Sequence, residues 1–403
     1  MKAGWRTSTL GEVSSFLNRG ISPKYLETGG VCVLNQKCIR DHRINFEPSR
    51  RHDEQAKKVG GDRFIQAGDV LVNSTGTGTL GRVAQLRETP PEPVTVDSHV
   101  TIVRPIPGKF HPEFFGYMMI VIEDAIKEAG EGCGGQTELA RSVLAEKFSV
   151  NYPESLSEQQ RIVGILDEAF EGIAIAKANA EKNLQNARAL FESHLQSVFT
   201  QEAEGWDRVR IEEACESIID CVNKTATKVD EPTPFKMIRT TNVKNGYVNL
   251  DSVYYVTEDV YRVWTRRQIP QRGDVILTRE APMGEVGMLL SDEKVFLGQR
   301  LVSYRVNPSK LNNRFLLYAF QSGNLQGQIH ALASGSTVQH MRVPDTKNLQ
   351  LPLPNLRKQV EVVANLDALR TETQRLESIY KQKLAALDAL KNSLLDQAFT
   401  GLL

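Results

Sequence analysis

The 403-residue chain lacks several features that mark large classes of protein. Its five cysteines form no C-x-x-C pair and have no histidine at zinc-finger spacing, so we interpret them as reduced thiols. The longest apolar run, at 114–122, contains one glycine and ends at two acidic residues, well short of the roughly 18 residues of a membrane span. Residues 1–16 hold no apolar run of signal-peptide length, so we expect a cytoplasmic protein with no membrane partner.

Signatures of catalysis are also missing. The sequence contains no P-loop, no H-E-x-x-H and no G-x-S-x-G, and its seven histidines are scattered. Residues 76–81 spell G-x-G-x-x-G, but a strand-like segment follows them and the repeat partner at 281–284 loses the pattern, so we interpret them as a hairpin turn. Residues 151–154 (NYPE) lack the second proline and the aromatic end of the amino-methyltransferase motif. We therefore expect no catalytic residue and no metal on this chain.

The net charge is zero, with 49 basic and 49 acidic residues, but the charge is unevenly distributed. Residues 1–110 carry 16 basic and 11 acidic side chains, whereas 111–155 carry 3 and 8. In the second half, residues 236–342 carry 14 basic and 8 acidic side chains. Each half thus has a basic part that can face phosphate, although an ordinary mixed surface is the alternative.

The chain repeats itself once, with a period of about 200 residues. LSEQQRIVGILD at 156–167 matches LRKQVEVVANLD at 356–367, and the same shift of 200 pairs Phe199-Thr200 with Phe399-Thr400. A register held without a gap is typical of a continuous helix, because an insertion would rotate everything beyond it. Elsewhere the shift wanders between 200 and 205, as it does in loops between strands.

Apolar residues at steps of three and four predict two long amphipathic helices at the repeated segments, each about 66 Å long. We expect their two stripes to bury each other as an antiparallel coiled coil. The central stripe residues are Ile162, Leu166, Ile173, Leu184 and Phe191 in the first helix, and Leu366, Leu369, Leu376, Leu387, Leu390 and Leu394 in the second.

The remaining segments consist mainly of short strands and turns. The expected strands are 31–39, 69–75, 82–86 and 100–105, then 235–243, 274–278, 285–290 and 301–306, and the expected helices are 111–127 and 312–323. We therefore predict an α+β fold with an internal two-fold repeat. Its parts are a strand-rich domain at 1–155, a helix at 156–200, a second strand-rich domain at 201–355 and a second helix at 356–403.

Polar loops recur at the same places in both halves but with different residues. The aligned segments are Asn35–Cys38 with Arg239–Asn242, Gly135–Glu138 with Gly335–Val338, and His99 with Arg300. Two readers of different base sequences on one scaffold need such loops, because Gln and Asn pair with adenine edges and Arg pairs with guanine. The alternatives are loop drift after a duplication and, for His99, a structural histidine.

Several motifs occur in a specific order along the whole chain. They are W-x-x-x-x-L-G-E-V at 5–13, GISPKY at 20–25, GDVL and GDVI at 68–71 and 273–276, GGQTELARSVL at 134–144, LSEQQRIVGILD at 156–167, and the endings FESHLQSVFT and LKNSLLDQAFTGLL. With two helices 200 residues apart, this order resembles the specificity subunit of type I restriction-modification systems. GISPKY has only a weak counterpart in the second half, IDCVNKTA at 219–226.

The resemblance implies two target recognition domains that each read one half of a split DNA sequence, while the antiparallel coiled-coil helices set the spacing. It implies as partners double-stranded DNA, two modification subunits that carry S-adenosylmethionine and methylate adenine, and restriction subunits that use ATP and Mg. It implies no cofactor on this chain.

We predict that the DNA-contacting residues lie at loop tips and beside strand ends. They are Lys24, Tyr25, Gln36, Lys37, Ser74, Thr75, Thr77, His99, Gln136, Thr137, Lys224, Thr240, Thr241, Asn242, Arg279, Arg300, Ser336, Thr337, Gln339 and His340. A coiled-coil scaffold that joins protein partners without touching DNA is the alternative, and salt-dependent duplex binding separates the two. A self-sufficient methyltransferase is a third hypothesis, for which the sequence lacks both required motifs.

Overall fold

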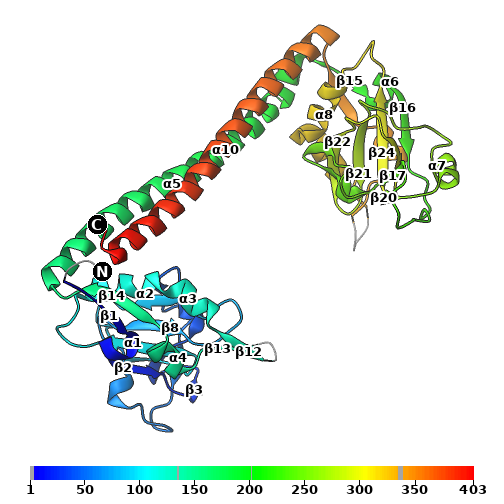
Figure 1. The fold of residues 1–403 in the computed structure, drawn as a ribbon. Coiled ribbons are helices and arrows are strands. Elements are labelled where there is room, and N and C mark those ends of the chain that lie inside the picture. The colour runs from blue at the N-terminus through cyan, green and yellow to red at the C-terminus, as the bar shows by residue number, and fades with distance from the viewer. Residues whose placement is uncertain (1–3, 134–135, 201, 335–338) are drawn as a thin grey trace. The chain divides into compact units, whose positions relative to one another are not determined.

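The computed structural model describes residues 4–133, 136–200, 202–334 and 339–403, with the backbone alone at 131–133, 136–137 and 202. The chain divides into two units: Met1–Ala180 with Gln382–Leu403, and Glu181–Lys381. Each unit therefore contains one strand-rich domain and parts of both long helices (Figure 1).

The first unit is built on two four-stranded sheets. One is antiparallel, in the order β2 (Ser14–Arg19), β11 (Val100–Pro105), β8 (Val70–Asn73) and β9 (Val83–Gln85). The other has the order β10 (Val94–Val96), β4 (Val31–Leu34), β7 (Arg50–His52) and β3 (Tyr25–Leu26), and its β10 and β4 are parallel. The unit also contains α1 (Leu10–Val13), β5 (Ile39–Arg40), β6 (Arg43–Ile44), α2 (Pro112–Val121), α3 (Glu123–Glu128), β12 (Glu131–Cys133), β13 (Gln136–Glu138) and α4 (Arg141–Glu146).

The second unit repeats this plan. Its large sheet has the order β16 (Cys215–Asp220), β24 (Leu301–Val306), β21 (Val275–Arg279), β22 (Met283–Met288), β19 (Gly246–Val248) and β18 (Val243–Lys244). Its small sheet has the order β20 (Tyr254–Tyr255), β17 (Phe235–Ile238) and β23 (Lys294–Leu297), with β17 and β23 again parallel. The helices are α6 (Ile211–Ala214), α7 (Glu258–Trp264), α8 (Asn313–Gln321) and α9 (Gly323–Ala331).

Each strand-rich domain is closed by its own first and last strands. In the first, β1 (Trp5–Thr9) pairs antiparallel with β14 (Ser149–Pro153), and in the second, β15 (Asp207–Arg210) pairs with β25 (Gln350–Leu353). Trp5 lies opposite Pro153, and Asp207 opposite Leu353. The chain thus enters and leaves each domain at one place, next to the start of a long helix.

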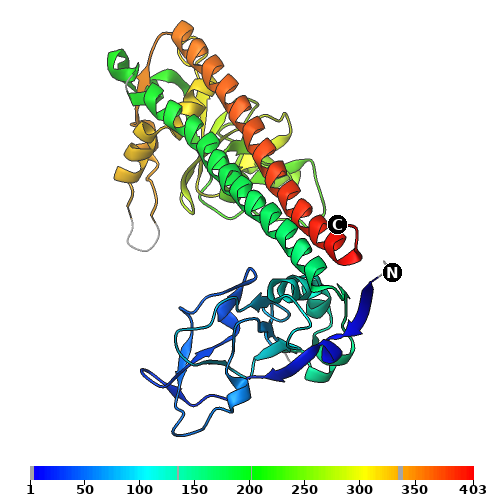
Figure 2. The same cartoon turned by 90° about the vertical axis from the view of Figure 1, so that its left-hand side faces the viewer.

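The long helices α5 (Leu156–Thr200) and α10 (Leu356–Thr400) each contain 45 residues. They run antiparallel within each unit, as Figures 1 and 2 show, and ion pairs join them: Lys177 Nζ lies 2.6 Å from Asp388 in the first unit, and Arg188 Nε lies 3.1 Å from Glu377 in the second. None of the helices in the described residues is long and apolar enough to cross a membrane.

The helix ends also form part of the domain cores. Ile162, Leu166 and Phe399 pack in the core of the first unit, and Phe199 and Leu366 in that of the second. This packing was not predicted, because the stripe was expected to face only the partner helix. Leu390, a predicted stripe residue, is instead 47% exposed.

The same polar contacts brace both halves. Gln159 Oε1 accepts from His111 N at 2.8 Å, and Gln359 Oε1 accepts from Asn312 N at 2.8 Å. Asp167 and Asp367 accept hydrogen bonds from the phenols of Tyr117 and Tyr318. Burial raises the pKa of Tyr117 to about 12, so its hydroxyl stays protonated and keeps donating.

In each unit a buried ion pair joins one strand to the residue that precedes its neighbour: β11 to the start of β8 in the antiparallel sheet of the first unit, and β24 to the start of β21 in the six-stranded sheet of the second. The Arg104 Nε and Nη2 atoms both lie 2.8 Å from the Asp69 carboxylate, and Arg305 binds Asp274 in the same way at 2.9 and 2.8 Å. Asp274 also accepts from Gln271 N at 3.0 Å. The same Arg–Asp pair occurs at the same place in both units, so the two sheets are built in the same way.

Replacing Asp274 by Ala should lower the free energy of unfolding of the second unit by about 3–5 kcal/mol, because it leaves a mostly buried guanidinium without its carboxylate partner. Denaturant unfolding of the chain measures this. The matched control is Glu258→Ala, which removes the partner of Arg262 in a pair whose side chains are 72% and 55% exposed and should change stability by less than about 1 kcal/mol. Equal effects of the two substitutions would contradict the prediction.

Several expected elements are broken where the sequence looked continuous. The strand expected at 31–39 stops at Leu34, because Asn35 caps a 3-10 turn (η1, Gln36–Cys38), and 235–243 is interrupted by the equivalent turn (η4, Thr240–Asn242). The helix expected at 111–127 is two helices, α2 and α3, that meet at Ile122. Helices α7 and α9 were not predicted. Strand β11 and the hairpin turn at 76–81, between the antiparallel β8 and β9, are as predicted.

Candidate nucleic-acid interface

Corresponding strand ends meet at one edge of the β2-β11-β8-β9 sheet in the first unit and of the six-stranded sheet in the second. In the first, Ser74 N donates to His99 O at 2.8 Å just past the ends of β8 and β11. In the second, Arg279 N donates to Arg300 O at 2.8 Å at the ends of β21 and β24. The registers agree, because Val100 pairs with Asn73 as Leu301 pairs with Thr278.

The side chains at these strand ends differ between the units. Thr75 Oγ1 and His99 Nδ1 are 2.7 Å apart, whereas the same place in the second unit holds an ion pair, with Arg300 Nε 3.1 Å from Glu280 Oε2. We call these two contacts the strand-end pairs. The fold therefore presents a threonine–histidine pair in one domain and a glutamate–arginine ion pair in the other.

A 3-10 turn lies beside each strand-end pair. Gln36 Oε1 accepts from Thr79 Oγ1 at 3.1 Å, and Thr240 Oγ1 donates to Ala281 O at 3.0 Å. Each bond ties the 3-10 turn to the hairpin turn that follows Thr75 or Glu280. Gly76 is required there, since its φ is +104° and a Cβ atom would lie 2.4 Å from Gln36 Oε1.

A further segment completes each edge. Leu139 N donates to Ser74 O at 2.8 Å, and Met341 N donates to Arg279 O at 3.0 Å. The backbone of Glu138 bridges to Thr75, and that of His340 bridges to Glu280. In each unit, segments that are distant in the chain thus converge on one edge, although residues 335–338 of the aligned loops lie outside the described residues.

Desolvation raises the pKa of three groups in the first unit. Asp97 accepts from His99 N at 2.9 Å, and burial raises the pKa of Asp97 despite this bond. Burial also raises the pKa of the Tyr25 phenol and of the Cys38 thiol. Both therefore stay protonated near neutral pH, and the tyrosine can donate a hydrogen bond.

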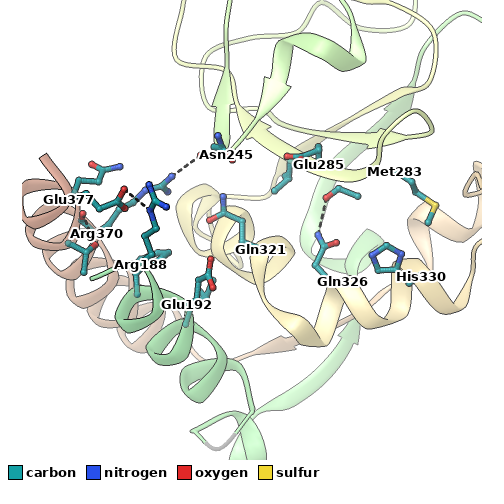
Figure 3. Close-up of a pocket in the computed structure, with 16 residues that line it drawn as sticks. Arg188, Glu192, Asn245, Met283, Glu285, Gln321, Gln326, His330, Arg370 and Glu377 are labelled. Atoms are coloured by element: carbon teal, nitrogen blue, oxygen red, sulfur yellow. Dashed lines mark hydrogen bonds and ion pairs between the residues drawn. The ribbon is translucent and has the colours of Figure 1, made fainter. Parts of the chain in front are cut away.

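A cavity of about 730 Å³ lies in the second unit between the long helices, α8, α9 and the start of β22 (Figure 3). Arg188 pairs with Glu377 on its helix side, and Arg370 Nη2 donates to Asn245 O at 2.7 Å. On its other side Gln326 Nε2 donates to Gly284 O at 2.9 Å. The Gln326 bond holds the turn after Glu280 against α9, and the Arg370 bond holds the loop at Asn245 against α10.

A family model matches both halves of this duplicated frame. The family is described as the type I restriction modification DNA specificity domain, and it matches residues 2–186 and 203–386. The chain belongs to this family. Each half contributes one specificity domain, as the sequence resemblance predicted.

The chain is also similar to curated members of such systems. It is 23% identical over 255 residues to the type I restriction enzyme MjaVIII specificity subunit of Methanocaldococcus jannaschii, covering 61% of this chain and 58% of that protein. It is 23% identical over 169 residues to the EcoBI specificity subunit of Escherichia coli, covering 41% and 35%. The matches thus span less than two thirds of either relative.

Two solved structures share the fold. A chain from a type I R-M system, studied for its complex assembly and conformational transition, has a TM-score of 0.78 at 20% identity and covers 99% of this chain and 98% of that one. The HsdS subunit from Thermoanaerobacter tengcongensis has a TM-score of 0.65 at 20% identity, with coverage of 100% and 98%.

Most predicted contact residues of the two specificity domains lie at the surface. Exposed are Lys24, Tyr25, Lys37, Thr77, His99, Lys224, Thr241 and Gln339, and partly buried are Gln36, Thr75, Thr240, Arg300 and His340. For Gln136 and Thr137 the structure gives the backbone of β13 only, and Ser336 and Thr337 lie outside the described residues.

Three predicted residues are buried within their specificity domains. Ser74 bonds the Thr101 hydroxyl, Asn242 Oδ1 accepts from Arg239 N at 2.9 Å, and Arg279 Nη1 donates to Met341 O at 2.9 Å. In this conformation they support the loops from inside. The direct DNA contact that the sequence predicted for them would need the loops to open.

Other residues of the specificity domains were missed. Glu280 was overlooked although it aligns with Thr75 at a shift of 205, which could have found it. Two cation–π contacts were also missed: Arg50 lies over the Tyr25 ring at 3.4 Å, and Arg239 over the Tyr254 ring at 3.9 Å. No sequence signal joins these partners, because strand pairing brings them together.

Proposed function

We propose that this chain is the DNA sequence-specificity subunit of a type I restriction-modification complex. Each specificity domain reads one half of a bipartite target, and the paired helices set the spacing between the halves. The observation that carries this proposal is the difference between the two strand-end pairs. The same place in the fold holds Thr75 with His99 in one domain and Glu280 with Arg300 in the other. Two readers of different sequences need such a difference.

The proposed partners are double-stranded DNA, two modification subunits docked on the helices, and restriction subunits in the full complex. S-adenosylmethionine belongs to the modification subunits and ATP with Mg to the restriction subunits, so this chain acts without a cofactor. A DNA substrate in the cell interior agrees with a cytoplasmic location. A coiled-coil scaffold without DNA binding is the less supported reading, since both halves match a DNA specificity family.

We assign different roles to the surface residues. Loop-tip groups such as Gln36 and Thr241 have hydrogen-bonding side chains suited to base edges. The exposed cations Lys24, Lys37 and Lys224 suit phosphates, which position a protein on the duplex without reading sequence. The excess of basic side chains in residues 1–110 and 236–342 supports this assignment.

We expect the purified chain to transfer no methyl group from S-adenosylmethionine to DNA, because methyl transfer belongs to its partner. Adding a modification subunit should yield adenine methylation at one bipartite motif, detected by long-read sequencing of the treated DNA. The complex should also bind duplex DNA with an affinity that falls steeply with salt. Methylation by the chain alone, or a complex that binds no DNA at low salt, would refute the proposal.

A further inference from the structure

We propose that the strand-end pair of each domain reads one base pair of its half-site, and that Glu280 with Arg300 selects a G·C pair. This inference rests on the proposed function and adds the base identity and the residues that choose it. The corresponding Thr75 and His99 pair reads a different base pair in the first half-site.

The ion pair between Glu280 and Arg300 leaves side-chain atoms of both residues free to hydrogen-bond with a G·C base pair. Glu280 Oε2 lies against the Nε edge of Arg300, at 3.1 Å. The terminal Nη atoms then form the fork that donates to N7 and O6 of guanine, the commonest specific contact in the major groove. The second oxygen of Glu280 can accept from N4 of the paired cytosine. A carboxylate that holds one edge of the guanidinium also fixes its plane before DNA arrives.

The pair is both accessible and firmly mounted. The Arg300 side chain is 43% exposed, whereas that of Glu280 is 19% exposed and is therefore more deeply buried. The turn after Glu280 is held by Thr240, which donates to Ala281 O, and by Gln326, which donates to Gly284 O. A side chain that discriminates between bases needs such a rigid support, because discrimination depends on hydrogen-bond donors that stay in place.

The backbone at Arg300 gives independent support. Its φ is +70°, in the left-handed region that a residue with a side chain rarely adopts. Glycine would fit there with less strain, yet the position holds the longest cationic side chain. Strained residues of this kind cluster at ligand sites, where the surrounding structure maintains them. His99, at the same place in the first unit, is not among the described residues with positive φ.

The Thr75–His99 pair cannot make the same selection. Thr75 and His99 offer a hydroxyl, a methyl group and one ring nitrogen beyond their mutual bond, and no bidentate donor fork. Moving these two residues into the second domain should therefore remove the preference for G·C there and leave the rest of the frame intact.

The experiment compares the wild-type complex with a double variant, E280T/R300H, which transplants the first domain's pair. For the wild type, changing the selected G·C pair to A·T should lower the methylation rate about 10- to 100-fold. For the double variant the ratio should fall to about 3-fold or less, with the first half-site unchanged. Rates are measured on duplexes that carry single substitutions at every position of the motif.

The matched control is Arg272→His, just before the start of β21, where the Arg272 side chain pairs with Asp292 at 3.5 Å and is 62% exposed. It should leave every ratio unchanged. A second variant, Arg300→Gly, removes the guanidinium while suiting the positive φ, and should lose the same preference even if the double variant unfolds.

The possible results separate the two ideas. A wild-type complex that methylates no bipartite motif would overturn the proposed function itself. If the motif is bipartite but holds no G·C pair in its second half, or if both variants keep the wild-type ratios, the reading by Arg300 is wrong. Equal loss of methylation on every duplex by a folded Arg300→Gly complex would also refute it, because that pattern marks a general contact rather than base choice.

Discussion

Exchanging residues 1–155 for the equivalent domain of a family member with a different target should replace one half of the methylated motif and leave the other half and the spacer unchanged. The physical reason is that one core of the domain lies wholly within residues 1–155, and that β1 and β14 close the domain. Long-read sequencing of DNA from cells with the chimera and its modification subunit measures the motif.

The junction needs care, because the helix ends pack into the domain. Phe114 contacts Phe399, with ring centroids 4.9 Å apart, and Gln159 bonds Lys109 O and Pro153 O. The matched control is a second chimera in which the new domain also keeps Phe114, the aromatic partner of Phe399. Simultaneous change of both halves of the motif, in a folded chimera, would show that the domains do not read independently.

Adding seven residues to both long helices should lengthen the spacer between the half-sites by about two or three base pairs, at 3.4 Å each. The insertions belong after Ala180 in α5 and after Lys381 in α10, where the two units divide. Seven residues add about 10 Å and rotate the helix by only about 20°, so the apolar stripe stays in register. The half-sites themselves should not change.

The control for this design adds five residues at the same two places. Five residues turn the helix by about 140° out of register, which exposes the stripe and should abolish methylation. An active seven-residue variant with an unaltered spacer would show that the helices hold partners but do not set the distance between half-sites.

The long helices could be predicted from the sequence because their register repeats. The predicted segment 156–200 matches α5 residue for residue, and α10 ends at Thr400, three residues before the predicted end. A helix stripe is local, since residues three and four apart share a face. The predicted burial of Leu390 was wrong, because the apolar stripe shows which face of α10 is apolar but not how much of that face α5 covers.

The recognition edges were predictable only in part. Aligning the repeat placed His99 with Arg300, and their strands confirm the equivalence. Burial of Asn242 and Arg279 could not be read from the sequence, because polar side chains mark loop tips and interior braces alike. Glu280 can be aligned with Thr75 at a shift of 205, but only its ion pair with Arg300 in the structure gives a reason to assign an acidic residue to this site.

The closing of each domain by its first and last strands has a consequence for how such a chain can change over generations. Trp5 beside Pro153, and Asp207 beside Leu353, mean that the two ends of a domain are neighbours. A DNA segment that encodes one whole domain can therefore be replaced by recombination without altering the path of the chain on either side. Such an exchange would replace one strand-rich domain as a unit and leave both long helices unchanged.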